Sequence, residues 1–342
     1  MSMQSLRENV CVFNRVEHVN SGETLNVGYL HTGTIIESIE LNGPKLILVY
    51  RDPENFITAK CKIKEYDELK VTYGDTFQKG KEYIDTFIVL TCRPIQDGNI
   101  EINAMAKPVY EMKKISDRAR AFTQRGIPEI LKSVAVKGMK FSLGTFPIVQ
   151  NYHIMPGERP TTMLRQMEQE QGSHIWYARN TLHMDKFVTM YAKDPVKTYE
   201  HGIASAENVI LKYTRPSGQI DAQETKLRTF TGWDEERGRL ATPSNNPLLS
   251  KMKSKPKTFA AGVDNEFVLG QAVVGEKLVI DFIASGSFTV EPGVALALRW
   301  HQRNMQQPIN QGLPAKVVVT TVSHWYQPQK YAIRVQGRPW LM

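Results

Sequence analysis

Short runs of alternating apolar and polar residues fill the sequence from about residue 10 to residue 110. The clearest runs are LILVYRD, AKCKIKEY, ELKVTYGD, DTFIVLTCRPI and NIEINAMAK. A period of two turns one face of a strand toward a core and the other toward solvent. Turn residues separate the runs at Asn42–Gly43, Gly74–Asp75 and Asp97–Gly98, and the last pair is a strong hairpin signal. Many short strands with little helix between them predict a small antiparallel barrel or a sandwich.

A second strand-rich region begins near residue 205. Its runs are VILKYTR, TKLRTFTGW, EKLVIDFIA, SFTVEPGVALALRW, AKVVVTTVSHWYQ and KYAIRVQGR. Between Asp234 and Lys257 the sequence is polar, and Pro243, Pro247 and Pro256 exclude long regular elements there. We therefore predict a second β domain with an irregular insertion at about residues 234–260.

The segment between the two β regions begins with helical patterns. MKKISDRARAF is basic and predicts a helical connector. RGIPEILKSVAVKGMKF predicts a short helix with Pro128 in its first turn and a stop at Gly138.

The stretch PTTMLRQMEQEQGSHIWYARNTLHM, residues 160–184, predicts a helix followed by a hairpin. The helix opens at Pro160 or Thr161 and ends at Gly172. SHIWYAR and HMDKFVTMYA then predict two strands joined at Asn180–Thr181. The apolar stripe of the helix consists of Met163, Leu164 and Met167.

These patterns together predict an α+β fold that is mainly β. Antiparallel β domains over residues 1–112 and 201–342 flank a small α+β domain over residues 113–200. A chain of 342 residues is long enough for each domain to bury its own core. The two β domains can share a shape without sharing sequence.

The composition is that of an ordinary globular protein, with 41% hydrophobic and 23% charged residues. No apolar run approaches the roughly 20 residues that span a bilayer. Arg7 and Glu8 interrupt the place where a signal peptide is apolar, so we expect synthesis and folding in the cytosol. Cys11, Cys61 and Cys92 fit no paired zinc spacing or disulfide framework, and Cys61 is predicted to be a buried strand thiol.

The net charge of +8 favours nucleic acid or an acidic surface as a partner. The basic residues are dispersed, however, and the densest run, SKMKSKPK, has the proline and serine content of a solvated loop. A phosphate-binding strip is the alternative interpretation of that run, whose lysines are Lys251, Lys253, Lys255 and Lys257.

The common catalytic and binding motifs are missing from the sequence. The eight histidines include no metalloprotease pair around a glutamate, and there is no phosphate loop, G-x-S-x-G elbow or G-x-G-x-x-G after a strand. Carboxylate pairs for glycoside cleavage stay open, because spacing in sequence does not fix distance in space. We therefore expect no catalytic, cofactor-binding or metal-binding residue, no cofactor and no enzyme activity.

The aromatic residues of the 160–184 stretch raise the question of a histidine site. On a strand, His174 and Trp176 point to one face and Ile175 and Tyr177 to the other. A metal or proton-transfer site at His174 and His183 would need a third partner, which the sequence does not offer. We favour a structural joint: a half-buried hairpin whose aromatic rings cover the preceding helix, with the polar atoms at its rim. We likewise expect His301 and His324, which lie near aromatic or β-branched strand residues, to be structural.

The order of these elements resembles a known family. A helix ending in MLRQMEQEQG is followed at once by an aromatic strand and a short return strand, and RGIPEILKSVAVKGMKF resembles the short helix that begins the same domain of the family. Near the C-terminus, a Pro292–Gly293 turn precedes a strand, and a later strand carrying Val322 and His324 turns into one carrying Tyr331. This pattern is similar to the hub proteins of contractile injection machines. They comprise the baseplate hub of contractile-tailed bacteriophages, the late-control tail protein and the hub portion of type VI secretion spike proteins.

The resemblance implies a structural hub with two tube-like β-barrels in each chain. Three chains would form a ring that joins a six-fold tail tube to a three-fold central spike. The implied partners are two further copies of the chain, the tail tube protein, the central spike protein, other baseplate proteins and DNA that passes through the channel without sequence-specific binding. The implied location is the tail baseplate of a virion assembled in the host cytoplasm, with no membrane-spanning segment.

Two further expectations accompany the resemblance. Because the sequence stops at Met342, after the second β region, we expect the spike to be a separate protein. The alternatives are the hub of a phage-derived contractile injection particle and a nucleic-acid-binding β-barrel protein. The second of these is favoured by the charge but lacks an aromatic-basic strand motif.

Overall fold

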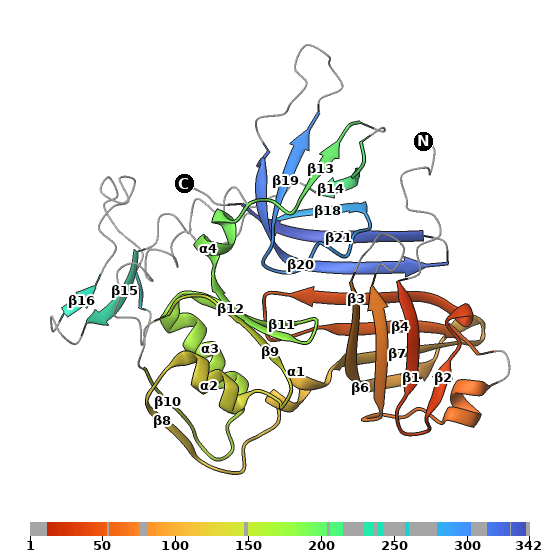
Figure 1. Cartoon of the computed structure of the whole chain (residues 1–342), viewed down its shortest axis with the longest axis horizontal. Coiled ribbons are helices and arrows are strands. Elements are labelled where there is room, and N and C mark those ends of the chain that lie inside the picture. Colours follow the sequence, from red (N-terminus) through yellow and green to blue (C-terminus); the bar gives the residue numbers. More distant parts are fainter. Residues whose placement is uncertain are drawn as a thin grey trace.

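The computed structural model describes residues 12–52, 55–74, 81–146, 150–203, 206–214, 229–234, 239–241, 257–259, 279–301, 313–328 and 330–339. Three groups of elements are visible in Figure 1: a first β unit at the lower right, a second β unit at the top and a middle unit of helices and short strands at the lower left. The two β units belong to one continuous sheet of 13 strands. The predicted fold class, α+β and mainly β, is confirmed. The domain limits at residues 112 and 200 stay predictions.

The first β unit is an antiparallel sheet that curls on itself. Its strands follow the order β3-β4-β7-β6-β5-β1-β2. Phe13 of β1 reaches across to β3, where its ring occupies the space that a side chain at Gly33 would need. Only glycine leaves room for this contact. The elements of the unit are β1 (Phe13–His18), β2 (Glu23–Leu25), η1 (Val27–Tyr29), β3 (Leu30–Ser38), β4 (Lys45–Arg51), η2 (Phe56–Cys61), β5 (Glu68–Gly74), β6 (Glu82–Pro94), η3 (Gln96–Gly98) and β7 (Asn99–Ala106).

The second β unit follows the order β13-β19-β20-β21-β18-β14. An isolated bridge between Glu200 and Val209 brings β13 back beside the residue that precedes β14, so the path of strands closes. The strands are β13 (Lys197–His201), β14 (Ile210–Thr214), β18 (Ile280–Ser285), β19 (Ala295–Trp300), β20 (Lys316–Gln327) and β21 (Lys330–Arg338).

The two β units have the same strand order. When the strands of each unit are ranked along the chain and β2 is set aside, both sheets run in the order 1-4-5-6-3-2. All neighbouring strands of the first unit are antiparallel, including the first pair, β1 and β5. In the second unit the corresponding pair, β13 and β19, is parallel, and the other pairs are antiparallel. The similar topology predicted for the two ends of the chain is therefore present in strand order and differs in the direction of one pair.

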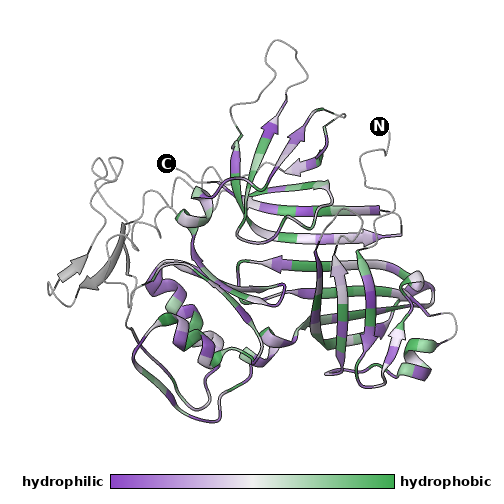
Figure 2. Ribbon diagram, viewed as in Figure 1, coloured by the Kyte–Doolittle hydropathy of each residue, from purple (hydrophilic) through white to green (hydrophobic). Residues whose placement is uncertain are grey.

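One long strand, β20, joins the two β units. Its beginning pairs with β19, from Lys316 to Val318. Its later part, Thr321–Tyr326, leaves that neighbour and pairs with β3 of the first unit. Hydrophobic and hydrophilic residues alternate along the strands on both sides of this junction (Figure 2). This is the pattern of a sheet with one face in the core.

The middle unit packs helices against a three-stranded sheet in the order β11-β12-β9. Its elements are α1 (Lys107–Met112), β8 (Arg120–Arg125), α2 (Ile127–Val134), β9 (Lys140–Leu143), β10 (Gln150–Ile154), α3 (Pro160–Gln171), β11 (Ser173–Ala178), β12 (Thr181–Lys186) and α4 (Phe187–Ala192). The predicted insertion contains β16 (Arg239–Ala241) and β17 (Lys257–Phe259), which form a small sheet with β15 (Thr229–Asp234) just before it. The strand predicted within TKLRTFTGW is therefore present as β15, but it belongs to this small sheet and not to the sheet of the second β unit.

Helix α3 and the hairpin that follows it confirm the prediction for residues 160–184. Leu164 is fully buried, and Gly172 closes the helix in the left-handed conformation with φ 56°. The Glu168 carboxylate then accepts the backbone N–H of Ile175, which ties the helix to β11. The turn is one residue earlier than predicted, at Arg179 and Asn180, whose φ angles are 52° and 58°. Positive φ at both residues is the requirement of a type I′ hairpin turn.

The prediction of a strand for AKCKIKEY is wrong. Residues Phe56–Cys61 form a single turn of π-helix instead. The Asp52 carboxylate accepts the N–H groups of Ile57 and Thr58, and this capping favours a helical turn over an extended strand. Cys61 is buried as expected, but it lies in this turn and not on a strand.

Three predictions about helices were also wrong. Helix α2 ends at Val134 and not at Gly138, because Ala135 is already extended. The connector MKKISDRARAF is not helical: α1 ends at Met112, and Arg120–Arg125 form β8, which pairs with β10. Conversely, the second half of HMDKFVTMYA is helix α4, because Phe187 and Met190 are buried at the i, i+3 spacing of a helix.

The prediction for the lysine run from Lys251 to Lys257 lies outside the described side chains.

Candidate functional site

The turn of the β11–β12 hairpin inserts Arg179 between the two β units. The guanidinium has a side-chain exposure of 5% and forms ion pairs with Glu37 of β3 and Glu291 of the second unit, both at 3.1 Å. It also donates to the backbone carbonyls of Phe288 at 2.6 Å and Val290 at 3.0 Å. One side chain of the middle unit thus binds both β units.

Aromatic rings surround this ion pair. The Arg179 guanidinium lies over the Tyr83 ring at 4.8 Å from its centre. Phe288 stacks on His324, with ring centres 4.4 Å apart. The His324 ring is fully buried between Glu37, at 3.5 Å from its Nε2, and the Tyr331 hydroxyl, at 2.7 Å from its Nδ1. His324 is therefore a hydrogen-bonded structural histidine, as its sequence context predicted.

The charges of this junction are fixed by their neighbours. Burial raises the pKa of Glu37, but Arg179 and His324 lower it more strongly, to about 2. Burial lowers the pKa of Arg179, but the two carboxylates raise it above its ordinary value. For His324, burial outweighs the hydrogen bond to Glu37 and lowers the pKa. At neutral pH the junction holds a charged carboxylate, a charged guanidinium and a neutral imidazole.

A second buried carboxylate, Asp85, joins the first β unit to the hairpin. It accepts hydrogen bonds from the hydroxyls of Tyr73 and Tyr177, both at 2.6 Å. Burial raises the pKa of Asp85 from 3.8 to about 6, although the two hydroxyls act in the opposite direction.

We expect Asp85 to make the stability of the chain depend on pH. Because its pKa is raised in the folded state, the folded chain binds the proton more tightly. The contribution of protonated Asp85 to the free energy of unfolding is therefore full below about pH 4 and is lost as the pH rises through about 6. Urea unfolding at pH 4 and at pH 7 measures this effect. The free energy of unfolding of wild type minus that of Asp85→Asn should be larger at pH 4 than at pH 7 by about 2–3 kcal/mol. A difference that does not change between these pH values would contradict this assignment.

The two histidines of the 160–184 stretch each lie against an aromatic ring. His183 stacks on Trp176 with ring centres 4.9 Å apart, and burial lowers its pKa to about 4. His174 lies near Phe187, and burial lowers its pKa to about 4 as well. His301 is elsewhere, beside Glu200. The described residues contain no group of three or more potential metal ligands.

The Trp176 ring lies on the opposite side of the hairpin from the one we predicted. Ile175 and Tyr177 belong to the large apolar cluster that includes α3. Trp176 belongs to a smaller cluster with Ile39 and Val318 of the β units, and its indole N–H is buried without a partner and not at a rim. The hairpin therefore contacts the β units from both faces: Tyr177 reaches Asp85 of the first unit on one face, and Trp176 packs against both units on the other.

The residues that matter most at the junction were missed by sequence reasoning. Arg179 occupies a turn position where glycine or asparagine is usual. An arginine at such a position indicates that its side chain has a role of its own. Glu37 occupies an inward position in the alternating run of β3, where an apolar residue is expected. Nothing in the sequence shows that these two residues meet.

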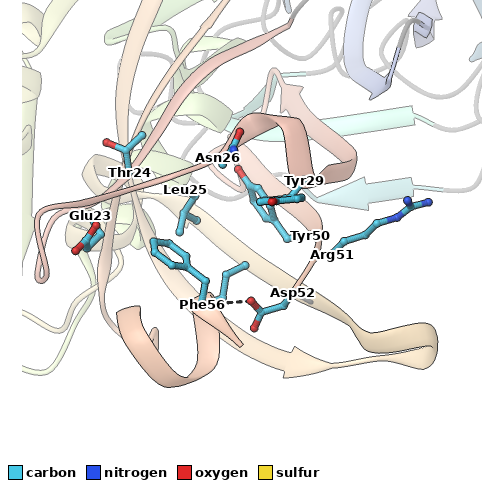
Figure 3. Close-up of a pocket in the computed structure, with 10 residues that line it drawn as sticks. Glu23, Thr24, Leu25, Asn26, Tyr29, Tyr50, Arg51, Asp52 and Phe56 are labelled. Carbon is cyan, nitrogen blue, oxygen red and sulfur yellow. Dashed lines mark hydrogen bonds between the residues drawn. The ribbon is translucent and has the colours of Figure 1, made fainter. Parts of the chain in front are cut away.

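A cavity of about 330 Å³ lies in the first β unit between β2, β4 and η2 (Figure 3). Leu25, Phe56 and Tyr50 supply its apolar surface, while Asp52 is engaged with the backbone of η2. The Asp52 carboxylate at this cavity therefore holds a helical turn in place. Within the described part of the chain, every helix is too short or too polar to span a membrane.

Comparison with solved structures relates this fold to tail proteins. A tail protein from Neisseria meningitidis matches with a TM-score of 0.65 and 13% identity over 96% of each chain. The prophage MuSo2 43 kDa tail protein from Shewanella oneidensis matches with a TM-score of 0.62 and 13% identity over 96% of this chain and 97% of that one. A Francisella PdpA–VgrG complex matches with a TM-score of 0.54 and 9% identity, over 98% of this chain and 55% of the other. No family model and no curated protein matches the sequence. The chain has the fold of phage tail proteins, as the resemblance implied.

Proposed function

We propose that the chain is the structural hub of a contractile tail baseplate, acting as a homotrimeric adaptor between a six-fold tube and a three-fold spike. The shared strand order of the two β units carries this proposal. A ring of three chains presents six similar β units, which is the number that a six-fold tube requires. The likeness to tail proteins over nearly the whole chain supports the same role.

The partners follow from this position. The chain would bind two further copies of itself, the tail tube protein above, the central spike protein below and other baseplate proteins around it. DNA would pass through the channel without sequence-specific binding. The match to a chain of a PdpA–VgrG complex supports a partner at the spike. The site of action is the virion tail baseplate, after assembly in the host cytoplasm.

We also propose that the chain acts without catalysis. At the junction, Glu37 and Arg179 neutralise each other, and the Asp85 carboxylate accepts two tyrosine hydroxyls. These groups are buried and engaged in holding the units together. Peptidoglycan hydrolysis by the pure protein that is lost on changing one aspartate or glutamate would overturn this part of the proposal.

The adaptor role predicts a trimer with a central channel. Light scattering of the purified chain should give three times the mass of one chain. Images of the particles should show a ring with six similar lobes. A compact monomer would contradict the proposal. Retention of the monomer on DNA with strong salt dependence would instead favour a nucleic-acid-binding protein.

A further inference from the structure

A groove lies between the middle unit and the second β unit. Its floor is a row of side chains across the three-stranded sheet, in which Trp176 is opposite His183 and His183 is opposite Ser142. One wall is the segment from Glu291 to Val294, and the other includes Asp185 and Lys193. The groove has a volume of about 680 Å³. Its walls carry both acidic and basic side chains, so it suits a polar side chain better than an apolar one.

Strand β9 forms the edge of this sheet beside the groove. The N–H groups of Lys140 and Gly144 point toward β12, where they bind the carbonyls of Asn180 and Met184. Because the direction of backbone groups alternates along a strand, the N–H and C=O groups of Phe141 and Leu143 point the other way. Among the described strands, none pairs with that outer edge. An unpaired edge of this kind is a template for another extended chain.

We propose that the outer edge of β9 receives an extended segment of a neighbouring copy of this chain, as a fourth strand beside β9. This inference rests on the proposed trimer. The contact between copies in a three-fold ring is heterologous, so the edge of β9 must meet a different surface of its neighbour. That neighbour has extended backbone to offer, because β2 and β8 each keep one edge unpaired among the described strands.

The groove gives this contact its specificity. Residues that lie opposite each other on neighbouring strands point to the same face of a sheet. The residue of the added strand opposite Ser142 therefore directs its side chain over the groove, next to Ser142 and on the far side of it from His183. Backbone hydrogen bonds hold the segment, and the groove selects the one side chain that fits between its charged walls.

Residue-resolved hydrogen exchange tests the proposal and contains its own control. The amides of Ser142 and Gly144 point toward β12 and should exchange slowly in the monomer and in the trimer. The amides of Phe141 and Leu143 should exchange rapidly in the dilute monomer and about tenfold or more slowly in the trimer, once they are hydrogen-bonded. A trimer in which Phe141 and Leu143 still exchange rapidly overturns this inference and leaves the hub proposal standing. A chain that is monomeric at every concentration overturns both.

A proline variant gives an independent test. Thr145 is exposed, and its N–H belongs to the outward set, so Thr145→Pro removes one edge donor without touching the ladder to β12. The variant should unfold at the same urea concentration as wild type but form the trimer at least about tenfold more weakly. The matched control, Thr145→Ala, keeps the N–H and should assemble normally. Equal assembly of the two variants contradicts the proposal.

Discussion

Replacing Arg179 with leucine is expected to lower the free energy of unfolding by about 3–5 kcal/mol. The change leaves the Glu37 carboxylate charged, fully buried and without its main partner. The carbonyls of Phe288 and Val290 lose their donor at the same time. Removing one member of a buried ion pair costs far more than the pair contributes, because the remaining charge cannot reach water. Urea unfolding at pH 7 measures the loss.

Arg334 provides the matched control for this prediction. It also pairs with a carboxylate, that of Asp281, but its side chain is 60% exposed. Arg334→Leu should therefore cost no more than about 1 kcal/mol. Adding Glu37→Gln to Arg179→Leu should recover part of the loss, because the buried charge is then gone. Equal costs for the two arginine variants would show that the Glu37–Arg179 pair does not hold the units together.

Replacing Leu164 with alanine is expected to cost about 2–5 kcal/mol, because the side chain is fully buried and its removal leaves a cavity. Leu164 of α3 belongs to the same apolar cluster as Ile175 and Tyr177 of the hairpin. His183→Ala, on the other face of the hairpin, should cost much less and should leave assembly intact. A loss of function on His183→Ala at normal stability would contradict the structural interpretation of the hairpin.

An exposed position in the same helix provides the control for the Leu164 experiment, because alanine there changes helix propensity without removing buried packing. Gln166 lies in the same helix and is exposed. Gln166→Ala should change the free energy of unfolding by less than about 0.5 kcal/mol. If both alanine variants have similar stabilities, Leu164 does not pack as the structure shows.

The sequence predicted most strands because their burial pattern is local. In β7 every second residue is buried, and the same alternation runs through β4 and β5. Helix α3 was predicted for a similar reason, since its apolar stripe and its terminal glycine both lie within a few residues. The turn at η2 was not predicted, because its cause is a hydrogen-bonding carboxylate, Asp52, that precedes the run.

The junction could not be predicted because its residues meet only in three dimensions. Glu37 and Arg179 are 142 positions apart, and His324 is a further 145 positions along the chain. Each residue alone is a charged or polar side chain in a strand or turn. Only the pairing of β3 with β20 and the inward turn of the hairpin make them one cluster.

The strand shared by both β units has a mechanical consequence. Six residue pairs join β3 to β20, from Thr321–Ser38 to Tyr326–Gly33. A rotation of one β unit against the other would have to shear these backbone hydrogen bonds, and it would also pull Arg179 out of its contacts. The two β units therefore move as a single rigid body, and the angle between them is set when one chain folds. In a ring of three such chains, three of the six angles between neighbouring β units would be set before any subunits meet. A pull or torque on one β unit would pass to the other unit of the same chain through continuous backbone.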